Sequence, residues 1–259
     1  MKNRDSAGFC VRFHFQGLLA DLLVRPHQAG RIIYCCRELP AVKDAIEALG
    51  IPHTEIDVIM AGGKSVDFRY PLQPDDQVDV YPYGWRLPNT SATRLIPPIT
   101  DEPRFILDVH LGKLARRLRL LGFDSLYRND YADEEIVRIA RREGRIILTR
   151  DRGLLKRKQV LSGCLLNSER PEDQLQILNR RYRLTGRINP LGRCSNCNGR
   201  LQPVDKAEVA DRLQPKTRRY YQSFRRCEDC GQVYWHGSHT EKILKWVEEI
   251  LRSPVEPCP

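Results

Sequence analysis

Short apolar runs alternate with amphipathic helical patterns between residues 104 and 151. Three of these runs predict strands, and each ends at or just before an aspartate: Phe105–Leu107, Ser125–Tyr127 and Ile146–Thr149. Leucine and alanine recur at helical spacing after the first run, which predicts a helix that ends at Gly122. A second helix is predicted from Asp133 to about Glu143, followed by Gly144. Strands that alternate with helices predict β-α-β units and a parallel sheet.

The aspartates that follow these strands are Asp108, Asp130 and Asp151. Because parallel strands end at the same edge of a sheet, the three carboxylates are expected to converge where such sheets bind ligands. Three carboxylates repel one another unless a cation, shared protons or basic neighbours are present. An all-oxygen cluster favours Mg²⁺ or Mn²⁺, which can activate a water for attack on a phosphodiester. The alternative for each aspartate alone is that it caps the next helix.

Three further acids are weaker candidates for the same site: Asp133, Glu134 and Asp173. Asp133 is best explained as a helix cap, with Glu134 beside it in the first turn. Asp173 falls in the first turn of a helix predicted from Pro171 to about Tyr182, where stabilisation by the helix dipole explains it as well as metal binding does.

Three stretches carry a family resemblance: FILDxxLGxLARxLRxLGFD, the helix start NDxxDxEI, and RIILTRDRGLL. They are similar to the Mut-seven C-terminal RNase family, a branch of the PIN-like nucleases, over about residues 104–182. The resemblance implies a metal-dependent ribonuclease with its acids at Asp108, Asp130 and Asp151. PIN-like sites usually use a fourth acid, and the sequence does not show which residue supplies it.

Residues 9–85 form a separate predicted domain of two strands, a helix and further strands, which suggests a β-grasp. The stretch IPHTEIDVIMAGGKSVDFRYPLQPDDQVDVYP resembles the ubiquitin-like sulfur-carrier class, and more closely the ubiquitin-like domain that precedes Mut-seven C-terminal RNases. Carrier chemistry needs a free C-terminal Gly-Gly, whereas Gly62 and Gly63 lie in a predicted hairpin. Docking of RNA, of a partner protein or of the neighbouring domain is the better interpretation, and a packing module is the alternative.

Proline, asparagine, serine and threonine are concentrated in residues 86–103, which predicts a linker. A basic cluster, Lys156, Arg157 and Lys158, follows the last aspartate and could hold an RNA backbone. The alternative is a solvated helix face with Leu154 and Leu155 packed inward. A fourth strand is predicted over residues 160–167.

Four cysteines in residues 190–252 predict a zinc ribbon, followed by a C-terminal helix: Cys194, Cys197, Cys227 and Cys230. Two CxxC pairs can present four thiolates tetrahedrally to Zn²⁺, and a site without an open position is structural. An iron-sulfur centre or redox dithiols are the alternatives. Nearby His236 and His239 are expected to serve in packing or RNA contact.

The loop between the two cysteine pairs interleaves cations with aromatic residues. Its candidate RNA-binding residues are Arg218, Arg219, Tyr220, Tyr221, Phe224, Arg225 and Arg226. Cations pair with phosphates while aromatic rings stack on unpaired bases. Some of these rings are also needed to fill the small core of a ribbon.

The net charge of +10 supports a polyanionic partner. Residues 1–100 carry 11 basic and 11 acidic residues, which leaves 32 basic and 22 acidic residues in the rest of the chain. Lys and Arg bind nucleic acid by releasing counterions. The alternative is that the surplus arginines only solvate helix faces.

No signal-peptide pattern and no apolar run long enough to span a membrane occurs in the sequence, which predicts a cytoplasmic protein. Five cysteines have no ligand-like spacing and are expected to be free thiols in that compartment: Cys10, Cys35, Cys36, Cys164 and Cys258.

Taken together, the sequence predicts an α/β protein with a β-grasp domain, a PIN-like domain and a zinc ribbon. The leading hypothesis is hydrolysis of RNA by Mg²⁺ or Mn²⁺ at the aspartate cluster. The alternatives are an RNA- or ribonucleoprotein-binding module that does not cut, and a protein-interaction adaptor. DNA is not excluded as a substrate.

Overall fold

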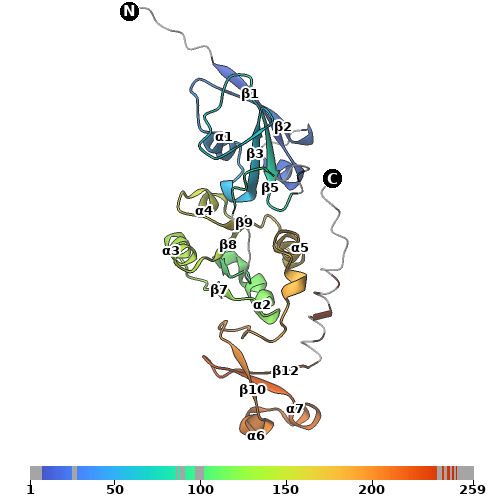
Figure 1. The fold of residues 1–259 in the computed structure, drawn as a ribbon. Helices are drawn as coiled ribbons and strands as arrows, with labels where there is room; N and C mark the ends of the chain where they lie inside the picture. Colours follow the sequence, from blue (N-terminus) through green and yellow to red (C-terminus); the bar gives the residue numbers. More distant parts are fainter. Residues whose placement is uncertain are drawn as a thin grey trace, which may run out of the picture. The chain divides into compact units, whose positions relative to one another are not determined.

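The computed structural model describes residues 8–24, 28–85, 87, 91–96 and 102–237, and the single positions 241, 244, 245, 247 and 249. These residues divide into two compact units. The first contains the described residues before 99 together with Asp151–Leu165, and the second contains residues from 99 to 150 and from 166 onward. The helices and strands are labelled in Figure 1.

The first unit is built on a five-stranded mixed sheet with the order β2-β1-β5-β3-β4. Its strands are β1 (Phe9–Phe15), β2 (Arg31–Cys36), β3 (Ile56–Ala61), β4 (Lys64–Val66) and β5 (Gln77–Pro82). β1 and β5 are parallel, and the other neighbours are antiparallel. Helix α1 (Val42–Ala48) and the 3-10 turns η1 (Gly17–Leu22), η2 (Gln28–Gly30) and η3 (His53–Glu55) complete this β-grasp arrangement.

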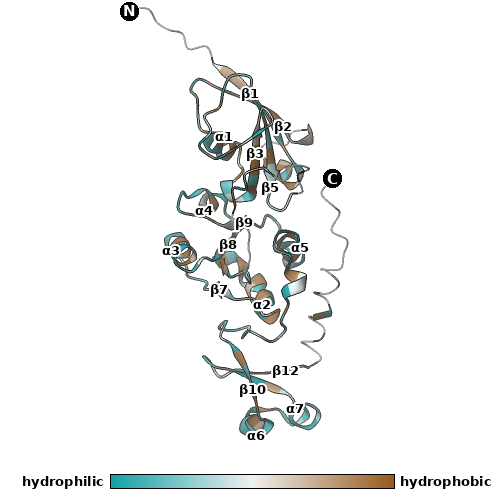
Figure 2. Ribbon diagram, viewed as in Figure 1, coloured by the Kyte–Doolittle hydropathy of each residue, from teal (hydrophilic) through white to brown (hydrophobic). Residues whose placement is uncertain are grey.

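One face of this sheet packs against α1, because alternate residues of each strand are apolar. Val11, Phe13 and Phe15 of β1 are fully buried with Ile46 of α1. Figure 2 shows hydrophobic colouring along these strands. The expected hairpin joins β3 to β4 through Gly62 and Gly63, which have φ of +55° and +79°, so glycine suits both positions.

The predicted parallel sheet has the order β7-β6-β8-β9, and its first three strands belong to the second unit. Its strands are β6 (Phe105–Leu107), β7 (Ser125–Tyr127), β8 (Ile146–Thr149) and β9 (Gly163–Leu165). β6 is parallel to both β7 and β8. Every residue of β6 and β8 is buried, as expected for strands covered on both faces. The prediction of an α/β fold with a parallel sheet is therefore confirmed.

Helices connect the strands of this sheet, and two more helical elements follow its last strand β9 (Figure 1). They are η4 (Val109–Leu111), α2 (Gly112–Leu120), α3 (Asp133–Glu143), α4 (Arg152–Lys156), α5 (Pro171–Tyr182) and η5 (Leu184–Arg187). Gly144 ends α3 in the left-handed conformation with φ of 62°, where glycine is favoured.

A three-stranded antiparallel sheet with the order β10-β11-β12 forms the ribbon of the second unit. Its elements are β10 (Leu201–Val204), α6 (Lys206–Val209), η6 (Ala210–Arg212), α7 (Pro215–Tyr220), β11 (Phe224–Cys227) and β12 (Val233–Trp235). Val209, Phe224 and Val233 are the buried residues of one small core. The long gap between the two cysteine pairs therefore holds β10, α6, η6, α7 and the first three residues of β11.

The segment Asp151–Leu165 is part of the first unit and makes several polar contacts there. The buried Glu55 carboxylate accepts a hydrogen bond from the Leu165 backbone N–H at 2.7 Å. Nε2 of His53 donates to the carbonyl of Val160 at 2.9 Å, and Arg152 donates to the carbonyl of Leu22 at 2.6 Å. These side chains satisfy backbone groups of a segment that is far away in the sequence.

Residues 91–96, within the predicted linker, also contact the first unit. Arg94 pairs with the buried carboxylate of Asp57, and the Leu95 backbone N–H donates to the Asp57 carbonyl at 2.7 Å. Ile96 is only 6% exposed. This part of the chain is thus packed against the β-grasp domain, whereas residues 86, 88–90 and 97–101 lie outside the described part.

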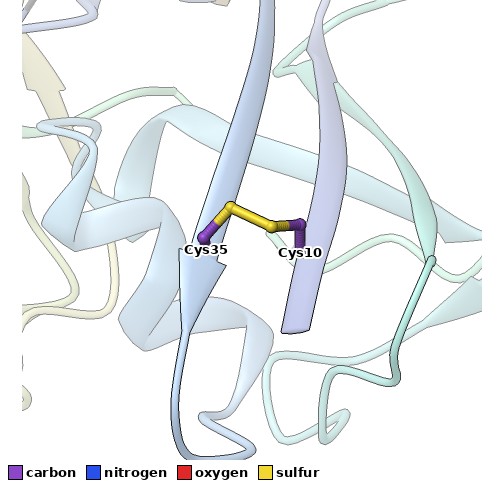
Figure 3. The surroundings of a disulfide bond; sticks show 2 residues. All are labelled: Cys10 and Cys35. Carbon is purple, nitrogen blue, oxygen red and sulfur yellow. A yellow bond between two sulfur atoms is a disulfide. The ribbon is translucent and has the colours of Figure 1, made fainter. Parts of the chain in front are cut away.

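Two cysteines expected to be free thiols, Cys10 and Cys35, form a disulfide with a Cα–Cα distance of 4.1 Å (Figure 3). They face each other directly in the antiparallel register of β1 and β2. The expectation was wrong because it used spacing along the chain, whereas strand register brings these residues together.

The predicted C-terminal helix extends largely beyond the described residues, which include only five positions after Gly237. His239 and Cys258 also lie outside them. Among the helices of the described part, none combines the length and apolar character that a membrane crossing requires.

Candidate functional site

Asp108 directly follows β6 and is the most constrained of the three predicted aspartates. Its side chain is buried, and it caps the turn η4 by accepting a hydrogen bond from the Val109 backbone N–H at 2.6 Å. The other carboxylate oxygen accepts a hydrogen bond from the Thr149 hydroxyl at 2.8 Å. Thr149 is the last residue of β8, so the ends of two neighbouring strands fix the orientation of this carboxylate.

Asp130 lies three residues after β7 and is exposed. Arg128 donates to both of its carboxylate oxygens, at 2.9 and 2.7 Å. These hydrogen bonds lower the pKa of Asp130 from its ordinary value. Arg128 also lies over the ring of Tyr131, 5.1 Å from its centroid. A metal ion at Asp130 would therefore have to share this carboxylate with a guanidinium group or displace it.

Asp151 lies two residues after β8, is exposed, and caps α4 by accepting a hydrogen bond from the Gly153 backbone N–H at 2.7 Å. It is grouped with the first unit, whereas Asp108 and Asp130 belong to the second. Among the described residues, the four ribbon cysteines are the group of potential metal ligands that lie within 4.8 Å of one another. The aspartates share their positions after parallel strands but do not form such a group.

The additional candidate acids lie in the first turns of helices. Asp133 is the first residue of α3, and Ala132 occupies the cap position, so Asp133 is one residue further along than a cap. Glu134 follows it and is exposed. Asp173 accepts a hydrogen bond from the Ser168 hydroxyl at 2.7 Å in the first turn of α5. All three suit the positive end of a helix dipole.

The four cysteines of the ribbon form a compact thiol cluster. The sulfur atoms of Cys194 and Cys230 are 3.6 Å apart, and those of Cys197 and Cys227 are 3.4 Å apart. Tetrahedral zinc with Zn–S bonds of about 2.3 Å separates its sulfurs by about 3.8 Å. The cluster therefore fits a metal such as zinc without rearrangement of the backbone.

Electrostatics in the cluster also favour a cation. Burial opposes ionisation of Cys194, but backbone N–H groups and the Tyr234 hydroxyl outweigh it and lower its pKa to about 7. Burial and the adjacent Cys227 thiol raise the pKa of Cys197 to about 12. One thiolate thus forms readily and a second does not, so a bound cation is needed for all four to ionise at neutral pH.

The first cysteine pair is attached to the parallel sheet. The Asn198 side chain accepts a hydrogen bond from the Ser125 backbone N–H of β7 at 2.8 Å and donates to the Asp124 carboxylate at 2.8 Å. Buried Arg119 of α2 donates to the carbonyls of Ser125 and Asn196 at 2.8 and 2.7 Å. The cysteine cluster is therefore held at the amino end of β7, whereas Asp130 follows its carboxyl end.

The Asp124 carboxylate is the centre of this attachment. It pairs with buried Arg145 at 2.7 Å and with Arg193 at 3.3 Å, and it accepts the hydrogen bond from Asn198. Burial opposes its ionisation, but Arg145 and Asn198 outweigh that effect and hold its pKa below the ordinary value. Sequence reasoning missed the roles of Asp124, Arg119 and Asn198, although Arg119 and Asp124 are fixed positions of the stretch FILDxxLGxLARxLRxLGFD. One available signal was Arg119, a cation within a leucine-rich helical segment.

The predicted RNA-binding residues of the ribbon separate into exposed and buried groups. Arg218, Arg219, Tyr220 and Arg226 are exposed, and the Arg219 guanidinium lies 5.5 Å from the centre of the Tyr220 ring. Phe224, in contrast, is buried in the ribbon core and has no face available for a base.

Two other members of the predicted ribbon set are partly buried. Tyr221 packs beside Trp235 with ring centres 6.3 Å apart. Arg225 donates to the carbonyls of Leu191 and Leu201 at 3.4 and 3.3 Å. These contacts use both side chains within the second unit, so the exposed surface consists mainly of α7 and Arg226.

The basic cluster after β8 is also divided. Lys156 donates from Nζ to the Glu47 carbonyl, and Leu154 and Leu155 beside it are buried. Arg157 is half-buried, and Lys158 is exposed. Inward packing of the two leucines agrees with the alternative considered for this segment, and Lys156 has a structural contact.

Comparison with protein families gives two matches. A model described as the Mut7-C RNAse domain matches residues 103–247, and one described as Mut7-C ubiquitin matches residues 8–87. The first match includes both the parallel sheet and the cysteine cluster. No curated protein and no solved structure matches the chain.

Replacing Asp124 with Asn should destabilise the second unit by about 3 kcal/mol at pH 7, because buried Arg145 then keeps Glu143 as its one remaining charged partner among the described residues. Since the pKa of Asp124 is lowered by folding, its contribution is present above the unfolded value near 3.9 and is lost as pH falls through the folded value. Urea unfolding at several pH values should show the difference from wild type shrinking below about pH 4. Asp211→Asn, at an exposed position, is the control; an Asp124→Asn difference that does not change with pH would contradict this account.

Proposed function

Because this chain belongs to the Mut7-C RNAse domain family, we propose that it is a ribonuclease that hydrolyses RNA phosphodiesters with Mg²⁺ or Mn²⁺ at Asp108, Asp130 and Asp151. The observation that carries the proposal is the family match across residues 103–247, which includes an orientated carboxylate, Asp108, at the end of a parallel strand. Asp130 and Asp151 also follow parallel strands of this sheet.

The donor set fits a hard divalent cation. Carboxylate oxygens are the ligands that Mg²⁺ and Mn²⁺ prefer, and Mg²⁺ commonly keeps several waters beside one or two carboxylates. Such an ion lowers the pKa of a bound water and stabilises the departing oxygen of a phosphodiester.

Within the chain, Asp108 would be the fixed ligand. Its two oxygens each accept one hydrogen bond, from the Thr149 hydroxyl and the Val109 N–H. Ionised carboxylate oxygens have further lone pairs for a cation. Thr149 and Val109 therefore limit rotation of the carboxylate, which lowers the cost of binding an ion there.

One observation favours a second candidate, an RNA-binding module that does not cut. The Asp130 carboxylate is engaged through both oxygens by Arg128, and the acid that would complete a PIN-like set of four is unassigned. Metal-dependent turnover separates the two candidates.

Removal of the metal tests the catalytic proposal directly. Protein stripped with EDTA should lose cleavage of single-stranded and structured RNA, and addition of Mn²⁺ or Mg²⁺ should restore it. Asp108→Asn and Asp151→Asn should each lower the restored rate at least about 100-fold, because outer-shell partners of metals alone are worth 10- to 100-fold. Asp205→Asn, an exposed ribbon position, should cut like wild type. RNA binding without cleavage under any metal would instead support the binding module.

We also infer that the exposed face of α7, with Arg218, Arg219 and Tyr220, contacts RNA. The two cations are available for phosphates, and the exposed tyrosine offers a ring for stacking on an unpaired base. The surplus of positive charge after residue 100 supports a nucleic-acid partner.

Alanine substitutions on α7 should weaken RNA binding in two distinguishable ways. Arg218→Ala or Arg219→Ala should reduce the slope of log affinity against log salt by about 1. Tyr220→Ala should cost about 1–3 kcal/mol of affinity for single strands and leave the salt slope unchanged. Fluorescence anisotropy with a labelled RNA provides the measurement, and Lys64→Ala, exposed in the first unit, is the control. If all variants bind RNA with the affinity of the wild type, α7 does not contact RNA.

The cysteine cluster, we propose further, holds one structural Zn²⁺. Four thiolates leave no open position for substrate. The contacts of Asn198 and Arg119 connect the ion to β7 and α2. Loss of zinc should therefore loosen the edge of the parallel sheet as well as the ribbon.

Metal analysis should find about one zinc per chain, and less than about half an equivalent after careful handling would count against the site. Chelation should also accelerate hydrogen exchange of the Ser125 amide, which donates to Asn198. The Val80 amide, in the separate sheet of the first unit, is the control. Iron in place of zinc would show an iron-sulfur centre instead.

A further inference from the structure

The outer face of the first sheet carries a groove of about 570 Å³. It is lined by three consecutive residues from each of three adjacent strands: 12–14 of β1, 31–33 of β2 and 77–79 of β5. Side chains alternate between the two faces of a strand. Phe13, Ile32 and Val78 point into the core, as their burial shows, so the outward side chains are those on either side of them.

Two arginines give this groove its positive charge. Arg12 and Arg31 are exposed, and neither side chain makes a hydrogen bond or an ion pair with any residue that the structure describes. His14 lies between them in the groove and contacts the Asp79 carboxylate at 3.1 Å. The acid in the groove thus already has a partner, whereas the two guanidinium groups have none among the described residues.

An exposed apolar side chain lies beside these cations. Ile33 is 70% exposed and is directly opposite Arg12 in the register of β1 and β2. Isolated exposed apolar residues are common on proteins, but this one is in a groove beside two cations that have no partner among the described residues. The combination fits a ligand that presents carboxylates around an apolar group.

The Cys10–Cys35 disulfide braces the same face (Figure 3). Cys10 is two residues before Arg12, and Cys35 is two residues after Ile33, so all four side chains project from the same side of the sheet. The covalent link keeps Arg12 and Ile33 opposite each other before any ligand arrives. A surface held in its binding geometry loses less entropy when it binds.

We propose that this groove binds an acidic, partly apolar segment of a partner protein. Carboxylates would pair with Arg12 and Arg31, and an apolar side chain would cover Ile33. RNA suits the groove less well, because the one ring that projects from this face of the lining, His14, already contacts Asp79 and Gln16. Residues 1–100 also have equal numbers of basic and acidic residues, unlike the rest of the chain. This surface is independent of the proposed ribonuclease activity.

The test uses the full chain and a fluorescent ten-residue peptide in which Glu and Asp surround two leucines. A peptide with Gln and Asn in place of the acids is the matched probe. The acidic peptide should bind, the neutral one should bind at least about tenfold more weakly, and rising salt should weaken binding because the charges are exposed. Arg12→Glu, Arg31→Glu and Ile33→Ser should each reduce affinity at least tenfold, whereas Lys64→Glu, exposed on another strand, should not.

Two results would overturn the proposal. The first is the absence of acidic-peptide binding up to about 1 mM, or binding that the groove variants leave unchanged. The second is a single-stranded RNA oligomer that binds the first unit and loses affinity with the same three variants, since this would make the groove a nucleic-acid surface. RNA cleavage by the groove variants, measured in parallel, should stay at the wild-type rate. Failure of peptide binding can then be told apart from failure of the proposed ribonuclease activity.

Discussion

The half-buried carboxylate of Asp124 joins the parts of the second unit. It neutralises Arg145, which precedes β8, and it accepts a hydrogen bond from Asn198, which follows the first cysteine pair. A charged group taken out of water needs compensating partners, and here two segments, one with Arg145 and one with Arg193 and Asn198, provide them. The sheet and the ribbon are therefore connected by charge and hydrogen bonding as well as by apolar packing of Leu120 with Leu191 and Leu201.

This arrangement gives the parallel strands two chemically different ends. At the amino ends, Arg145 and Asn198 gather around Asp124 beside the thiol cluster. After the carboxyl ends lie the aspartates, with Asp108 held by Thr149. Thiolates and carboxylates prefer different metals, so the thiol cluster would not compete for the ion proposed at the aspartates.

Regular elements were predictable from the sequence because their signals are local. The apolar run Phe105–Leu107, the helix stop at Gly144 and the glycine hairpin at Gly62 each depend on neighbouring residues. The cysteine cluster was predictable because two CxxC pairs in one chain are typical of a four-cysteine metal site.

Contacts between distant segments were not predictable in the same way. The Cys10–Cys35 bond depends on the register of two strands, and the burial of Phe224 depends on which face of β11 covers the ribbon core. The role of Arg128 at Asp130 depends on a rotamer. None of these leaves a periodic pattern in the chain, because each is decided by tertiary packing.

The hydrogen bonds between the β-grasp domain and the segment Asp151–Leu165 have a consequence for folding during synthesis on the ribosome. Glu55 and His53 each form a hydrogen bond with the backbone of a residue more than 100 positions later in the chain, Leu165 and Val160. At translation speeds of about 5–20 residues per second, these partners emerge roughly 5 to 20 seconds after the residues that need them. The β-grasp sheet can form at once, but its buried polar groups must wait for the next domain to be made. The β-grasp domain is thus translated first, but its last hydrogen bonds form only after part of the following domain has been translated.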